Sequence, residues 1–189
     1  MSAGPLSEPQ TTAIEGVWTV SSAVRGDNRG SFARLFDRDV LAPIHGGRPI
    51  VQVNRSVTAA RGAVRGLHFQ RPPRADAKWV RCLRGRVWDV AVDLRRGSPT
   101  FLAHTAVELS QEAMNAIFIP EGCAHGFQVL DPDSELLYLH SAPYAPEHEG
   151  GLRWDDPVLA IEWPLAVADI SERDRNHPLL GADFEGLVA

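Results

Sequence analysis

The sequence is a succession of short segments rich in β-branched and aromatic residues, separated by Gly-, Pro- and Asp-containing turns. Roughly nine or ten short strands are expected between residues 14 and 141, with little helix. Many short strands at regular spacing are typical of an antiparallel sandwich or barrel. A length of 189 residues suits one such domain. The sequence therefore predicts a single all-β domain over residues 1–189.

The expected strands cover residues 50–58, 61–70, 78–84, 86–94, 101–109, 116–120, 125–130 and 135–141. Gly85 predicts a tight hairpin between the third and fourth of these strands, and Gly66 a bulge or a close backbone approach. Residues 1–12 are polar and contain proline, so a loose N-terminal arm is expected.

Two short helices are expected outside these strands. One covers residues 34–43, before a glycine-rich loop. The other follows Ser171, which is placed as its N-cap, with Asp174 at the third helical position as in a capping box.

Charge and apolar patterning exclude several classes of protein. The formal net charge of −5 argues against a bulk nucleic-acid binder, which is usually basic. No apolar run approaches the length of a membrane span, and the first residues lack a signal-peptide pattern. Cys82 and Cys123 stand in apolar runs and predict two free buried thiols in a reducing compartment. These features predict a cytoplasmic protein without a nucleic-acid or membrane partner.

The segment AVRGLHFQ, residues 63–70, carries the most reactive combination of residues in the chain. Histidine exchanges protons near neutral pH, so His68 could be a catalytic base, although a lone histidine is more often a core residue. Arg65 suits an anionic ligand held beside a reactive carbon. Strict strand alternation places Arg65 and His68 on opposite faces, so a bulge near Gly66 is needed for both to line one pocket.

Other candidate residues are open to two interpretations. Tyr138 and Tyr144 are the only tyrosines; either could protonate an enolate or pack as an ordinary strand aromatic. Lys78 is the only lysine, and is either functional or a leftover of an arginine-rich composition. One face of a strand carries the polar side chains of Gln52, Asn54 and Ser56. This face is either exposed to solvent or lines a wet cavity inside a barrel, and alternation alone favours solvent.

Signatures of other catalytic sites are missing. A metal site in a small β-barrel typically needs two histidines at i and i+2, a carboxylate and a third histidine. His68 and His125 have no such neighbour, so no metal is expected. Phosphate-binding and dinucleotide-binding glycine patterns and a nucleophile elbow are also absent from the sequence.

Several motifs in a fixed order resemble the dTDP-4-dehydrorhamnose 3,5-epimerase family. They are RGxF at 29–32, QxN at 52–54, VRGLHFQ at 64–70, KWVRCLRG at 78–85, VWDVAVDLRRGSPTF at 87–101, IPEGCAHGF at 119–127, Tyr138, DDP at 155–157, IEWP at 161–164 and SERD at 171–174. The resemblance implies a cupin-type double-stranded β-helix, a jelly-roll barrel with a short helical C-terminal section. It also implies a homodimer without metal or other cofactor, acting on a nucleotide-linked 4-keto-6-deoxy sugar.

The same resemblance implies roles for individual residues. His68 matches the catalytic base, Asp174 its carboxylate partner, Tyr138 the general acid and Lys78 the cation at the enolate oxygen. Residues that match the substrate contacts are Arg29, Phe32, Gln52, Asn54, Arg65, His125 and Tyr144. Among these, Arg29 and Arg65 match arginines that hold the diphosphate, and Arg29 is expected to reach across the dimer. The row of Gln52, Asn54 and Ser56 is then expected to line the cavity.

These residue types suit proton transfer beside a ketone. A C4 carbonyl acidifies the protons on C3 and C5, a cation stabilises the enolate, and reprotonation from the opposite face inverts the carbon. The alternatives are an epimerase acting on C3 or C5 alone, a non-catalytic cupin that binds sugar nucleotides, and a metal-dependent cupin enzyme. Arg34 stands where family members commonly carry an acidic residue, at a position that lies close to the nucleotide end of the site in the family.

Overall fold

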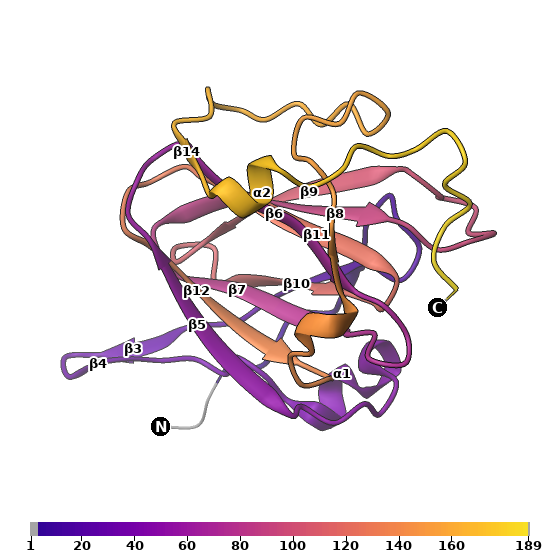
Figure 1. Cartoon of the computed structure of the whole chain (residues 1–189). Helices are drawn as coiled ribbons and strands as arrows, with labels where there is room; N and C mark the ends of the chain where they lie inside the picture. Colours follow the sequence, from indigo (N-terminus) through magenta and orange to yellow (C-terminus); the bar gives the residue numbers. More distant parts are fainter. Residues whose placement is uncertain (1–3, 189) are drawn as a thin grey trace.

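The computed structural model describes residues 4–188 and consists mainly of two sheets that face each other (Figure 1). The first sheet has the order β1 (Gln10–Thr11), β2 (Trp18–Ser21), β10 (Asn115–Ile119), β7 (Lys78–Arg84), β12 (Ser134–His140) and β5 (Gln52–Thr58). The second has the order β13 (Glu149–Gly151), β6 (Ala63–Gln70), β11 (Cys123–Val129), β8 (Arg86–Asp93) and β9 (His104–Ser110), with β14 (Asp169–Ile170) added parallel to β6. The predicted all-β, cupin-type fold is confirmed.

The order of the strands creates a barrel with an interior. Successive strands from β5 to β8 alternate between the two sheets, as in a jelly roll. Apolar side chains from both sheets fill one part of the space between them, with Val80 and Leu136 from the first sheet meeting Ala91 and Phe127 from the second. The remaining space is available for a ligand.

The predicted hairpin at Gly85 is wrong. β7 pairs with β10 and β12, whereas β8 pairs with β9 and β11 in the other sheet. Each strand has two partners within its own sheet, so neither offers the other a free edge. Gly85 does reverse the chain, with φ of 73°, but it carries the chain from one sheet to the other.

The predicted loose arm is also wrong where the structure describes it, residues 4–12; residues 1–3 lie outside the described residues. Leu6 bridges to Ser22 and is buried in an apolar cluster with Val20 and Phe118. β1 pairs with β2 farther along. Burial of Leu6 and this pairing together attach the segment to the first sheet.

The helices are short and lie at the ends of the barrel. α1 (Arg38–His45) begins after Asp37, whose side chain accepts hydrogen bonds from the amides of Asp39 and Val40, so it starts later than predicted. α2 (Glu172–Arg175) begins after Ser171, whose hydroxyl accepts a hydrogen bond from the Asp174 amide at 3.0 Å, confirming the predicted cap. A 3-10 turn, η1 (Pro146–His148), precedes β13. Among residues 4–188, no helix has the length and apolar character needed to cross a membrane.

His45, the last residue of α1, is buried without hydrogen bonds to its ring. Its ring lies between Phe36 and Phe118, with centroid distances of 5.8 Å and 6.3 Å. Neither ring nitrogen has a hydrogen-bond partner among residues 4–188. Burial lowers the pKa of His45, opposed only in part by the backbone of Arg48. The folded protein therefore favours the neutral imidazole.

We expect the free energy of unfolding to fall as the pH drops below about 6.5. The unfolded chain then binds a proton at His45, whereas the lowered pKa in the folded chain keeps this imidazole neutral. His45→Leu should remove this part of the pH dependence and leave stability near neutral pH unchanged or higher, since it removes two unpaired polar atoms. Urea unfolding of both proteins at about pH 7.5 and about pH 5 measures the difference. If the wild-type protein and His45→Leu lose the same free energy of unfolding between about pH 7.5 and about pH 5, His45 is not the source of the pH dependence.

Candidate active site

A cavity of about 910 Å³ lies between the two sheets and is closed on one side by α2. Of the residues that the sequence assigned to the site, it is lined by Gln52, Asn54, Arg65, His68, Lys78, His125, Tyr138, Tyr144 and Asp174. They come from β5, β6, β7, β11, β12, the segment after β12 and α2. The fold therefore gathers residues that are far apart in sequence.

The predicted bulge in β6 is present and brings Arg65 and His68 to the same cavity. His68 pairs with His125 and Arg65 pairs with Phe127, so three steps along β6 match two steps along β11. Gly66 lies within this irregularity with φ of 126°, and a Cβ there would lie 2.5 Å from the Gly126 Cα. Only glycine fits this close approach of β6 to β11.

His68 is held by the carboxylate of Asp174. His68 Nε2 lies 2.7 Å from Asp174 Oδ1, and the Gly66 amide donates to Asp174 Oδ2 at 3.1 Å. Burial alone would raise the pKa of Asp174, but the hydrogen bond and the charge of His68 and the Gly66 amide lower it overall. An ionised Asp174 that accepts the Nε2 proton leaves Nδ1 as the basic nitrogen of the neutral ring.

Tyr138 and Lys78 belong to the sheet opposite His68. The Tyr138 hydroxyl lies 3.2 Å from Ser56 Oγ on β5. Burial raises the pKa of Tyr138, and the hydrogen bond with Ser56 opposes this only in part. The phenol therefore keeps its proton at neutral pH and can donate it into the cavity. Lys78 is nearly buried, with 10% of its side chain exposed, and supplies a cation to the same space.

The polar face of β5 points into the cavity, as the resemblance implied. Gln52, Asn54 and Ser56 line it, and Asn54 Nδ2 lies 3.4 Å from His140 Nε2. The interpretation of this row as solvent-facing, favoured by alternation alone, is wrong because the barrel encloses a wet interior.

A second histidine–carboxylate pair lies deeper in the barrel. His125 Nε2 is 2.9 Å from Asp89 Oδ2. Burial raises the pKa of Asp89, and the nearby charges of His125 and Lys78 oppose this shift. The His125 ring also meets Tyr138 edge to face at 6.2 Å. Asp93, four positions farther along β8, does not contact His125 and instead binds Arg95.

Three further cavity or dyad residues were not predicted. His140 follows Tyr138 by two positions on β12, so alternation could have indicated that both face the cavity. Asp76 precedes β7 and accepts from His140. His177 lies beyond α2, its ring 5.6 Å from the His68 ring, and no pattern in the sequence signals this contact.

The donor atoms of His68, Asp174 and His177 all lie within 4.8 Å of one another, a group that could hold a metal ion. Their sequence spacing differs from the i, i+2 histidine pair on which the metal-free prediction was based. Metal independence therefore stays a prediction from the sequence, and elemental analysis of the purified protein tests it.

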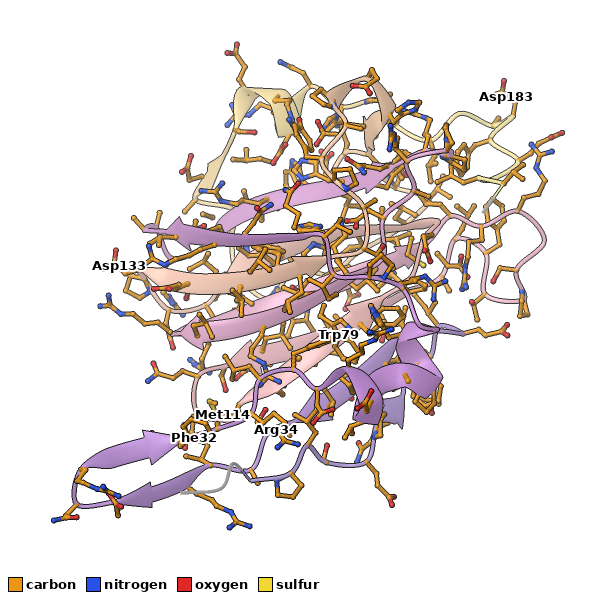
Figure 2. All side chains as sticks on the ribbon, turned by 90° about the horizontal axis from the view of Figure 1, so that it is seen from below. Phe32, Arg34, Trp79, Met114, Asp133 and Asp183 are labelled. Carbon is orange, nitrogen blue, oxygen red and sulfur yellow. The ribbon has the colours of Figure 1, made fainter. Side chains whose placement is uncertain are left out.

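Arg29 and Phe32 lie outside this cavity. They belong to the hairpin of β3 (Arg25–Asp27) and β4 (Gly30–Phe32), which projects from the body of the chain (Figure 1). Figure 2 shows Phe32 at the base of the hairpin and Arg34 next to the body. Arg29 is exposed and pairs with Asp27 at 2.7 Å, and Arg34 pairs with Asp37 at 2.5 Å. Within one chain, the hairpin does not contribute to the site.

Comparison with known proteins agrees with this arrangement. A sequence profile of the dTDP-4-dehydrorhamnose 3,5-epimerase family matches residues 11–182. The chain is 42% identical over 172 residues to the dTDP-4-dehydrorhamnose 3,5-epimerase of Sinorhizobium fredii, covering 90% of this chain and 88% of that protein.

Solved structures extend the similarity to three dimensions. The epimerase of Legionella pneumophila, in complex with dTDP-4-keto-L-rhamnose, superimposes with a TM-score of 0.89 at 34% identity, covering 98% of this chain and 100% of that chain. ChmJ, a 3'-monoepimerase of Streptomyces bikiniensis in complex with dTDP-quinovose, superimposes with a TM-score of 0.81 at 37% identity, covering 89% of this chain and 85% of that chain. The chain therefore belongs to the dTDP-4-dehydrorhamnose 3,5-epimerase family.

Proposed function

We propose that this epimerase inverts C3 and C5 of a dTDP-4-keto-6-deoxy-hexose with His68 as the base and Tyr138 as the acid. The observation that carries the proposal is the His68–Asp174 pair, 2.7 Å apart, in the same cavity as Tyr138 and Lys78 but on the opposite wall. A base and an acid on opposite walls can reach opposite faces of a sugar ring held between them.

The reaction needs two proton transfers at each carbon. His68 takes the proton from the carbon next to the C4 ketone, and the electron pair left behind delocalises onto the ketone oxygen as an enolate. The Lys78 ammonium stabilises that oxygen. Tyr138 then delivers its proton to the other face of the carbon, which inverts the centre, and both residues return to their starting states by proton exchange with water.

The remaining residues of the cavity suit a substrate that carries a diphosphate. Arg65 provides a guanidinium for the phosphates, and Gln52, Asn54 and Tyr144 provide hydrogen-bonding and stacking surfaces nearby. His125, fixed by Asp89, is placed to contact the sugar. A nucleotide-linked substrate agrees with the dTDP-sugar complexes of the similar Legionella and Streptomyces proteins.

A single-centre reaction is the second candidate, because the similar ChmJ is a 3'-monoepimerase. Incubation with dTDP-4-keto-6-deoxyglucose in heavy water separates the possibilities. Deuterium at both C3 and C5 is the expected result, and deuterium at one carbon supports the single-centre epimerase. No exchange at either carbon would contradict both for this substrate and leave a sugar-nucleotide binding protein.

We also propose a homodimer in which each β3–β4 hairpin enters the partner's cavity. β5 is an edge strand on which Val57 is 44% exposed, and Val53, which also lines the cavity, is 58% exposed. Exposed apolar side chains along an unpaired strand edge mark a contact surface. Phe32 on the hairpin is also exposed, and Arg29 in the same hairpin pairs with Asp27. Pairing through this face would supply the two predicted substrate contacts that the cavity lacks.

Mixing two inactive variants tests this shared site. Arg29→Ala combined with Phe32→Ala should weaken substrate binding, and His68→Asn should stop chemistry. Subunit exchange between them should restore about a quarter of wild-type activity, because half of the dimers are mixed and each has one intact site. Native mass spectrometry shows whether mixed dimers have formed. If mixed dimers are present and the activity does not rise, the site is not shared between subunits.

We further propose a cytoplasmic location. Cys82 and Cys123 are free and buried, which suits a reducing compartment. Burial raises the pKa of Cys82 to about 11 and that of Cys123 to about 12, so neither thiol is a candidate nucleophile.

A further inference from the structure

A third histidine–carboxylate pair lines the same cavity on the wall that carries Lys78 and Tyr138. His140 Nδ1 lies 2.7 Å from Asp76 Oδ2. The other oxygen of Asp76 accepts hydrogen bonds from the backbone amides of Ser141 and Ala142, each at 3.1 Å. Both side chains are largely buried, with 15% of His140 and 5% of Asp76 exposed. The carboxylate is thus held by three donors in a fixed position.

Asp76 is ionised in this environment. Burial by itself raises the pKa of Asp76, but the hydrogen bond from His140, the charge of Lys78 and the Ala142 amide lower it overall. A buried carboxylate with three hydrogen bonds and a nearby cation is a stable anion. It therefore places a full negative charge on this wall of the cavity.

Lys78 lies close to that charge but outside hydrogen-bond distance. Its Nζ is 3.8 Å from Asp76 Oδ2, and within residues 4–188 it makes no hydrogen bond to a protein group. An ammonium with only 10% of its side chain exposed is stabilised by an opposite charge nearby. Because the contact is longer than a hydrogen bond, its N–H donors remain available for a substrate oxygen.

His140 helps to hold Asp76 at this distance from Lys78. The Nδ1–H of His140 donates to Oδ2, the oxygen that lies 3.8 Å from Lys78 Nζ, and its Nε2 lies 3.4 Å from Asn54 Nδ2. The His140 ring also stacks on Tyr138, with centroids 5.9 Å apart and planes 13° apart. The ring therefore has little freedom to turn away from Asp76.

We propose that Asp76 is the counter-ion of Lys78, and that His140 is a positioning residue that keeps Asp76 from capturing the ammonium. The pair places a negative charge beside the Lys78 ammonium and leaves its donors available for the enolate oxygen. This inference rests on the proposed function, in which Lys78 stabilises the enolate. Neither Asp76 nor His140 touches the reacting atoms, so both act through Lys78.

Three variants separate this role from a structural one. Asp76→Asn keeps an oxygen for the amides of Ser141 and Ala142 but removes the charge. His140→Leu removes the donor and leaves the Asp76 carboxylate free to move toward Lys78. His140→Asn keeps a donor close to the position of Nδ1. Each is compared with His104→Asn on β9, a histidine outside the cavity.

We expect kcat for epimerisation to fall about tenfold in Asp76→Asn and in His140→Leu, which is the effect typical of losing a charged hydrogen-bonding group. In both variants KM should change by less than about threefold. His140→Asn should stay within about threefold of wild type. Because both residues act through one carboxylate, adding His140→Leu to Asp76→Asn should lower kcat by less than about twofold further. His104→Asn should behave as wild type, and thermal unfolding verifies that every variant is folded.

Different results would overturn the inference. If folded Asp76→Asn or His140→Leu keeps wild-type kcat, Lys78 needs no counter-ion from Asp76. If the two substitutions lower kcat independently in the double variant, His140 does not act through Asp76. A wild-type enzyme that exchanges no deuterium would instead contradict the proposed function, so the two failures are distinguishable.

Discussion

His68→Asn is expected to lower the rate of deuterium exchange at C3 and C5 by about two to four orders of magnitude. Asparagine keeps a polar amide near the carboxylate of Asp174 but has no basic nitrogen for the substrate proton. Since Asp174 lies at 2.7 Å and binds Nε2, the variant loses the base while the carboxylate keeps the Gly66 amide as a partner. Mass spectrometry of the sugar nucleotide after incubation in heavy water measures the rate.

Asp174→Asn tests whether the carboxylate acts through His68. It should lower exchange less than His68→Asn does, and should have little further effect when His68 is already replaced. His104→Asn on β9 provides the control for a histidine outside the cavity. Exchange at near wild-type rate in a folded His68→Asn protein would show that another group removes the proton.

The contact between His68 and Asp174 shows the limit of reasoning from sequence pattern. The two residues are separated by 106 positions. The local pattern correctly indicated a strand for His68 and, for Asp174, the first turn of a helix capped by Ser171, but it contains nothing about which strand meets which helix. Their pairing was predicted through resemblance to a family, and pattern alone favoured a core histidine. The His68–Asp174 pair therefore depends on tertiary structure that local propensity does not encode.

The glycines show where pattern succeeds and where it fails. Gly66 was predicted as a bulge because two functional side chains needed one face, and the register of β6 with β11 contains that irregularity. Gly85 was predicted as a hairpin because it separates two apolar strands, yet it joins strands of different sheets. A glycine signals that the chain turns, whereas pairing depends on the partners each strand finds elsewhere.

The faces of β5 show a related limit. Alternation correctly separated Gln52, Asn54 and Ser56 from Val53 and Val57, but it could not determine which row faces inward. In a filled sandwich the valines would be buried. Here the polar row lines a cavity, Val57 is exposed, and Val53 is exposed while it also lines the cavity. An inverted strand of this kind is the physical consequence of a barrel that binds a polar ligand.

Tyr138→Phe is expected to separate proton exchange from inversion. The variant keeps the ring against His125 and His140 but loses the hydroxyl that contacts Ser56. His68 can still remove a proton and return deuterium to the same face, so label should enter C3 and C5. Inversion needs a donor on the opposite wall and should fall by about two to three orders of magnitude.

Exchange and inversion are measured in one reaction, by mass spectrometry for deuterium and by NMR coupling constants for configuration, so each sample contains its own control. The ratio of the two rates is the decisive quantity, because a general loss of folding or binding lowers both together. A variant that loses both equally would place Tyr138 in substrate binding or enolate stabilisation rather than in protonation. A variant that inverts at the wild-type rate would assign the acid to another group on that wall, of which His140 is the neighbour two positions along β12. Because burial keeps the Tyr138 phenol protonated, the expected result is label with retained configuration.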